Sequence, residues 1–197
     1  KTKNNNYSQI IREFINSKDY DPFYNQLIHV ISEKTGIDYA GKNFHATLRG
    51  GRFEYLFFKL LKELECSGEI SSVRWNGRVD PQTGFARPAP GLVKGLPDLI
   101  FICANKHYLL ELTTIRGATQ QWRAEGLSVP WHIENYITQT GNSDVQGIFC
   151  VPETHPKVKK SLDSTHLPTH HDILYVTVDE FLNILSKPNL CENLSKL

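Results

Sequence analysis

The spacing of apolar residues predicts helices in the first third of the chain. Apolar side chains between residues 53 and 64 follow the series i, i+3, i+4, i+7, i+8, i+11, which places them on one buried face of a helix. We predict this helix over residues 51–66. Shorter stripes with helical spacing predict helices over residues 7–16 and 22–36, and Pro22 is favourable at a first helical position.

After Gly68 the pattern changes to short apolar runs that predict β-strands. The second and third runs are separated by Asn105-Lys106, which indicates a hairpin. A last helix is expected to begin with the capping box Thr177-x-x-Glu180 and to end at Pro188. Alternating helices and strands predict an α/β fold with a central mixed β-sheet flanked by α-helices. The predicted strands are residues 70–75, 98–104, 108–114, 146–151 and 173–176.

The composition is that of one ordinary globular domain. The chain has 197 residues, 40% of them hydrophobic and 22% charged, which argues against disorder. The net charge of +1 excludes a protein whose whole surface binds nucleic acid, but it leaves room for a local basic groove. No run of apolar residues is long enough to span a membrane, so no membrane partner is expected.

Cysteine usage indicates the cellular compartment, and methionine usage indicates how the chain was produced. The spacing of the four cysteines fits neither a zinc ribbon nor a disulfide framework. Cys103 and Cys150 lie in apolar runs and are expected to be small core residues of a cytoplasmic protein. Because the sequence contains no Met, even at residue 1, we expect a processed protein or a domain cut from a longer one.

Two acidic residues stand on neighbouring predicted strands. Asp98 opens one strand, and Glu111 lies among leucines in the middle of the next. A carboxylate in that position is costly unless it is compensated, and a hard ion such as Mg²⁺ prefers carboxylate oxygens and phosphate. The P-D-(x)₁₂-E spacing alone is a weak pattern that occurs by chance in many α/β proteins. If functional, it indicates a metal ion that polarises a phosphodiester and lowers the pKa of an attacking water.

Additional segments agree with this interpretation. They are Phe53-Glu54-Tyr55, Asp80 to Gly84, Pro90-Gly91, Glu111-Leu112-Thr113, Gly117, Gln120, Glu125-Gly126, Val129 to Ile133 and Thr177 to Phe181. With them the sequence resembles the PD-(D/E)XK nuclease superfamily, and more narrowly the cleavage domain of type IIS and nicking restriction endonucleases of the AlwI type. The resemblance spans residues 50–185 and implies a restriction-endonuclease-like fold. It also implies hydrolysis of DNA phosphodiester bonds with Mg²⁺, for which Mn²⁺ can substitute.

The resemblance assigns the metal site to residues on two neighbouring predicted strands. Asp98 and Glu111 match the metal-binding acids of the family, and the Leu112 carbonyl would complete the ligand set. Glu125 matches a later acid on which the AlwI-type domains rely, and Glu54 matches a helix acid that faces the same site.

Three further residues receive roles from the same resemblance. Thr113 stands where the wider superfamily has a catalytic Lys, which the AlwI-type domains also lack. Gln120 matches a Gln of the following helical segment, with the adjacent Gln121 as the alternative. His132 matches a family His, although Trp131 replaces the Arg that usually precedes it.

The long Gly/Pro-rich loop over residues 76–97 is the candidate DNA contact. Loops of this length inside a compact domain are usually functional or mobile. Arg74, Arg78, Arg87 and Lys94 make this region positive, so it is either simply solvated or in contact with DNA phosphates.

The resemblance also implies partners and a domain organisation. Residues 1–49 would be an N-terminal helical segment at the edge of a missing recognition domain, and residues 50–197 the catalytic domain. Double-stranded DNA would be recognised by a separate domain or subunit, and a dimer or heterodimer would cleave both strands. Two alternatives stay open: a structure-specific or repair nuclease of the same fold, and a catalytically inactive DNA-binding or assembly module.

Overall fold

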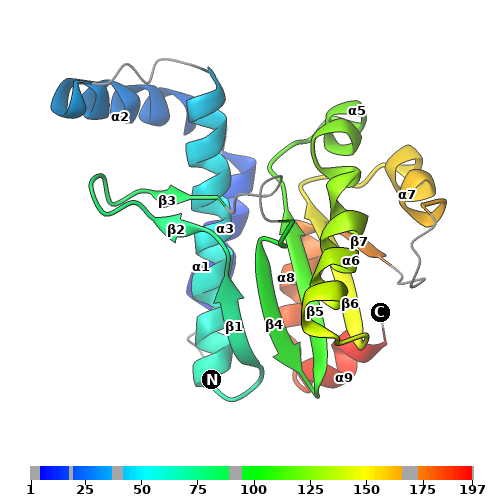
Figure 1. The fold of residues 1–197 in the computed structure, drawn as a ribbon. Coiled ribbons are helices and arrows are strands. Elements are labelled where there is room, and N and C mark those ends of the chain that lie inside the picture. The colour runs from blue at the N-terminus through cyan, green and yellow to red at the C-terminus, as the bar shows by residue number, and fades with distance from the viewer. Residues whose placement is uncertain (1–4, 18–19, 37–41, 89–94, 166–172, 197) are drawn as a thin grey trace.

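A five-stranded mixed β-sheet forms the centre of the protein, as the computed structural model shows (Figure 1). The structure describes residues 5–17, 20–36, 42–88, 95–165 and 173–196. The strand order is β1-β4-β5-β6-β7, in which β1, β4 and β5 are antiparallel neighbours and β5, β6 and β7 are parallel. The strands are β1 (Ser71–Trp75), β4 (Leu99–Cys103), β5 (Lys106–Leu112), β6 (Val145–Val151) and β7 (Ile173–Thr177).

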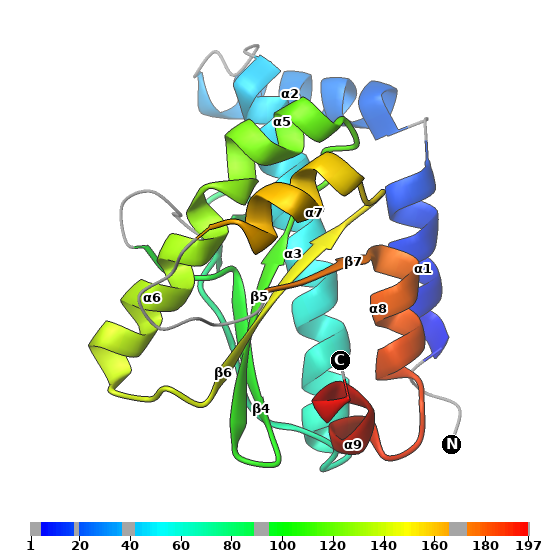
Figure 2. The same ribbon diagram turned by 90° about the vertical axis from the view of Figure 1, so that its right-hand side faces the viewer.

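Helices cover both faces of this sheet, as predicted (Figure 2). One face packs against α1 (Asn5–Asn16), α3 (Lys42–Cys66), α8 (Val178–Leu185) and α9 (Leu190–Ser195). The other packs against α6 (Ser128–Thr140) and α7 (Pro156–Asp163), with α5 (Ala118–Gln121) and the π-helical turn η1 (Trp122–Gly126) leading into α6. Along β5, Leu110 belongs to the first core and Leu109 to the second, because successive side chains of a strand point to opposite faces.

The helix α3 is longer than the apolar pattern predicts, because it begins at Lys42 rather than at residue 51. Gly50 and Gly51 both lie inside the helix. At Gly51 the short strand β3 (Ala86–Arg87) crosses so closely that a Cβ atom would lie 2.4 Å from the Ala86 carbonyl oxygen. The glycine therefore serves close approach of two backbones.

A small second unit extends from α3 away from the five-stranded sheet (Figure 1). It contains α2 (Tyr20–Thr35) and a hairpin of β2 (Arg78–Val79) and β3. Ile28 of α2 and Leu48 of α3 form its buried centre, with Phe44 and Phe85 packed against them. The hairpin lies within the segment predicted to be an entirely irregular loop.

The helix α1 packs into the main core. Its residues Ile11 and Phe14 are almost fully buried, and the Phe14 ring stacks on the Phe53 ring of α3 with 5.9 Å between centroids. The predicted domain boundary between residues 49 and 50 falls inside α3. The assignment of residues 1–49 to the edge of a recognition domain stays a prediction.

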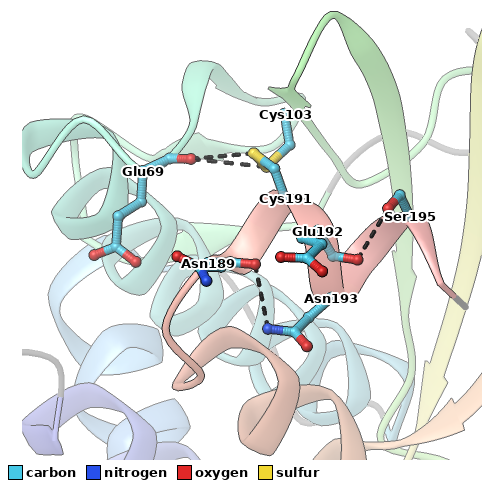
Figure 3. The surroundings of a disulfide bond; sticks show 7 residues. All are labelled: Glu69, Cys103, Asn189, Cys191, Glu192, Asn193 and Ser195. Atoms are coloured by element: carbon cyan, nitrogen blue, oxygen red, sulfur yellow. Dashed lines mark hydrogen bonds between the residues drawn. A yellow bond between two sulfur atoms is a disulfide. The ribbon is translucent and has the colours of Figure 1, made fainter.

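The expectation that the cysteines form no disulfide is wrong for one pair. Cys103 at the end of β4 is bonded to Cys191 of α9, with 5.4 Å between the Cα atoms and a sequence separation of 88 (Figure 3). The sequence separation hides this pair, because only the folded sheet brings α9 to the end of β4. Cys150 is buried, as predicted, and burial raises the pKa of its thiol.

Within the described ranges, no helix is both long enough and apolar enough to cross a membrane. The cytoplasmic location stays a prediction.

Candidate active site

A cavity of about 390 Å³ lies between the N-terminal half of α3, the end of β5 and the start of α6. Seven of the residues predicted from the sequence line it. They are Glu54, Asp98, Glu111, Leu112, Thr113, Glu125 and His132. These residues come from α3, the residue before β4, β5 and its continuation, η1 and α6, so the fold gathers them from five separate parts of the chain.

The register of two antiparallel strands brings Asp98 and Glu111 together. Leu99 of β4 pairs with Leu110 of β5, which places the preceding Asp98 opposite Glu111. The Leu112 backbone N–H donates to Asp98 Oδ2 at 2.8 Å and fixes one carboxylate oxygen. The predicted hairpin therefore sets the geometry of the two acids, although its turn lies at Ala104-Asn105 rather than at Asn105-Lys106, because Lys106 already pairs with Cys103.

Glu111 and His132 form a buried pair. The two residues are 5% and 3% exposed, and His132 Nδ1 lies 2.5 Å from Glu111 Oε1. Burial raises the pKa of Glu111, while the contact with His132 acts in the opposite direction. The His132 side chain thus orients the glutamate and offsets part of the cost of burying its charge.

Mutual repulsion among carboxylates characterises the site. Burial, followed by the charges of Glu54 and Glu111, raises the pKa of Asp98 well above its ordinary value. Burial and the charge of Glu111 raise the pKa of Glu125 to about 7. A bound cation would relieve this repulsion, because a nearby positive charge favours ionised carboxylates.

The donor chemistry of the cavity suits a hard divalent cation. Asp98, Glu111 and the Leu112 carbonyl offer the oxygen ligands that Mg²⁺ prefers. In the part of the chain that the structure describes, no three or more His, Cys, Asp or Glu side chains are already arranged as a metal-binding group.

The structure does not bring Gln120 into the cavity. Its side chain is exposed, whereas the adjacent Gln121 is fully buried. Gln121 Nε2 donates to the Ile115 carbonyl at 2.7 Å and the Glu153 carbonyl at 2.9 Å, and its Oε1 accepts from the Tyr175 hydroxyl at 2.6 Å. Because successive helical residues point about 100° apart, burying one glutamine turns its neighbour outward. Gln121 supports the backbone that follows β5.

The predicted DNA-contacting residues lie outside the lining of the cavity. Arg74 and Arg78 are exposed. Arg87 instead pairs with Asp80 at 3.4 Å and lies over the Phe44 ring, 4.8 Å from its centroid, so its guanidinium stabilises the hairpin. Lys94 lies outside the described residues.

Sequence reasoning missed two residues that contact the acids, Trp75 and Asn76. The Trp75 indole N–H donates to Glu54 Oε2 at 2.8 Å. Asn76 donates through its backbone N–H to the Asp98 carbonyl at 3.0 Å. No sequence signal could have found them, because these contacts depend on the pairing of β1 with β4 and on the packing of β1 against α3.

No protein-family model and no curated protein matches the sequence. Nine chains of solved structures match the fold, which is that of a restriction endonuclease. One of them is the crystal structure of the small subunit, R.BspD6I2, of the heterodimeric restriction endonuclease R.BspD6I. The two chains are 19% identical with a TM-score of 0.57, and the match covers 86% of this chain and 77% of that one. At this identity the likeness establishes the predicted fold alone.

Proposed function

We propose that the protein is a metal-dependent endonuclease that hydrolyses DNA phosphodiester bonds, as the cleavage domain or subunit of a type IIS restriction endonuclease of the PD-(D/E)XK type. The observation that carries this proposal is the gathering of Glu54, Asp98, Glu111 and Glu125 in one cavity of a restriction-endonuclease-like fold. Four carboxylates in one partly buried site are stable together only when protons or cations reduce their charge.

Each cavity residue has a role in this proposal. Asp98, Glu111 and the Leu112 carbonyl would hold Mg²⁺ or Mn²⁺, which supplies stabilisation of phosphate charge and a more acidic bound water. His132 keeps Glu111 oriented through the contact of 2.5 Å. Glu125, with a pKa of about 7, is suited to accept a proton from an attacking water near neutral pH. Thr113 has no ionisable group, so it cannot replace the superfamily Lys as a base.

A partner would supply what this chain lacks for double-strand cleavage. The structural neighbour R.BspD6I2 is the small subunit of a heterodimeric enzyme, which supports a heteromeric arrangement for this protein. A single active site per chain would cut one strand of a duplex. Sequence recognition would then come from a separate domain or subunit.

A plasmid nicking assay with Mg²⁺ tests the proposed activity. We expect the unsubstituted chain to convert supercoiled DNA to open circles, and Glu111→Gln to slow this conversion at least about a hundredfold. The exposed Glu192 of α9 provides a matched control, and Glu192→Gln should leave the rate unchanged. Equal rates for the Glu111 and Glu192 variants would contradict the proposal.

Thr113 in the Lys position also favours a second candidate, an inactive DNA-binding or assembly module. Calorimetric titration with Mn²⁺ separates the two. An active nuclease should show metal binding that Asp98→Ala removes, whereas an inactive module should show no binding that depends on the carboxylates.

A further inference from the structure

The end of β1 contacts the two acids that arrive from α3 and β4. Trp75, the last residue of β1, donates its indole N–H to Glu54 Oε2 at 2.8 Å. Asn76 donates its backbone N–H to the Asp98 carbonyl at 3.0 Å and its side-chain Nδ2 to the Pro97 carbonyl at 2.5 Å. Two adjacent residues therefore restrain both the Glu54 carboxylate and the backbone that carries Asp98.

Packing holds the Trp75 ring in the orientation that this contact needs. The ring stacks on Phe58 with 5.7 Å between centroids and meets Tyr55 at 5.5 Å. Two residues further along the chain, a Cβ atom at Gly77 would lie 2.3 Å from the Trp75 ring. Only glycine at position 77 therefore leaves room for the ring. Since Tyr55 and Phe58 lie one and four residues after Glu54 on α3, the same helix turn fixes both partners of the hydrogen bond.

The charges of the site explain why such restraint is useful. Glu54 is 4% exposed and lines the same cavity as Asp98 and Glu111. Carboxylates that repel one another tend to move apart, and a wider spacing of the acids would weaken binding of a cation. A neutral N–H donor stabilises the ionised carboxylate and leaves the overall charge of the site unchanged.

We propose that Trp75 and Asn76 are positioning residues of the acid cluster, with Trp75 holding the Glu54 carboxylate toward the cavity and Asn76 holding the backbone around Asp98. This inference rests on the proposed function, because it takes the cluster to be the metal site of the nuclease. The action of Trp75 is indirect: it changes metal binding only through Glu54.

Calorimetric titration of the full chain with Mn²⁺ tests this dependence. Trp75→Phe keeps a stacking ring but removes the N–H donor, and it should weaken Mn²⁺ binding about tenfold, the ordinary effect of losing a hydrogen bond to a charged group. In a Glu54→Gln background the same substitution should change Mn²⁺ affinity less than about twofold, because the group it acts through is already altered. Trp122, another partly buried tryptophan, supplies the control Trp122→Phe, which should bind Mn²⁺ normally.

A second variant keeps the test valid if Trp75→Phe fails to fold, as far-ultraviolet circular dichroism would show. Gly77→Ala forces the Trp75 ring to move but removes no hydrogen-bonding atom, and it should weaken Mn²⁺ binding in the same way. Equal weakening by Trp75→Phe with and without Glu54→Gln would overturn the inference, and so would unchanged affinity. If the unsubstituted chain binds no Mn²⁺, both the proposed function and this inference fail. If it binds Mn²⁺ but Trp75→Phe has no effect that depends on Glu54, only the inference fails.

Discussion

At the scale of single residues, the cavity combines buried carboxylates with a small number of compensating contacts. Glu111 is 5% exposed and is oriented by His132, and Asp98 accepts the Leu112 N–H. These contacts lower the cost of burial but do not remove the repulsion among the acids, so the metal-free site is electrostatically strained. The arrangement is typical of sites that trade stability for function.

The raised pKa of Glu125 predicts how stability depends on pH. Its pKa rises from 4.5 to about 7 on folding, so the folded chain binds a proton more tightly than the unfolded chain does. The stabilisation from this proton is fully present below pH 4.5 and is lost as the pH rises through 7. Glu125→Gln does not titrate at this position and so escapes this loss. Without metal, the free energy of unfolding of Glu125→Gln should therefore increase relative to that of the unsubstituted chain as the pH rises from about 5 to about 8, as measured by urea denaturation. A constant difference between the two proteins across this range would contradict the assignment.

The sequence was sufficient to predict the residues whose chemistry stands out from their neighbours in the sequence. Asp98 and Glu111 were identified because a charged residue beside or inside an apolar strand is unusual, and all the predicted acids line one cavity. Trp75, Asn76 and Gln121 were missed or left open, because their contribution consists of contacts that exist only after the strands pair. The choice of Gln120 over Gln121 depended on a helical phase that the sequence could not fix.

At the scale of elements, the connection after β5 is held by one buried amide. Gln121 links the Ile115 carbonyl, the Glu153 carbonyl and the Tyr175 hydroxyl, and so ties the segment after β5 to the segment after β6 and to the middle of β7. This connection continues directly from Thr113 in the cavity wall. The position of the wall therefore depends on a residue that does not itself line it.

Gln121→Leu should destabilise the fold by about 2–4 kcal/mol, because it leaves several buried polar groups without partners. Chemical denaturation monitored by circular dichroism measures this change. The matched variant Gln120→Leu alters an exposed side chain and should change the free energy of unfolding by less than about 0.5 kcal/mol. Similar losses from both variants would show that Gln121 has no special role.

The elements themselves follow the apolar pattern where that pattern is long or strongly alternating. All five predicted strands of the sheet are confirmed, with ends shifted by a few residues. The short helix α7 was missed because only Val158 and Leu162 mark its buried face. The predicted start of α3 at residue 51 is too late, because the regular apolar series begins only at Phe53, whereas the helix itself begins at Lys42.

At the scale of the whole molecule, contacts between distant parts of the chain join the two ends to the sheet. Arg12 of α1 pairs with Asp179 of α8 at 2.9 Å, and Arg116 after β5 donates to the Ile15 carbonyl at 2.8 Å. At the other end, the Cys103–Cys191 disulfide joins α9 to β4. The first helix and the last are both packed into the main core.

The disulfide predicts a specific loss of stability. Cys191→Ser opens a loop closed over 88 residues and should lower the free energy of unfolding by about 2–4 kcal/mol under non-reducing conditions. Cys66 is exposed and free, so Cys66→Ser is the control and should unfold like the unsubstituted chain. Denaturant midpoints that agree for all three proteins would mean that this bond contributes nothing to stability.

The most direct test of the central claim is the conversion of supercoiled plasmid to open circles in Mg²⁺, compared between the intact chain and Asp98→Ala. If the acid cluster is the catalytic centre of a nuclease, the intact chain accumulates open circles over time, EDTA stops the reaction, and Asp98→Ala leaves the plasmid supercoiled. Nicking by Asp98→Ala at the rate of the intact chain, or the absence of metal-dependent nicking by the intact chain, would contradict the account.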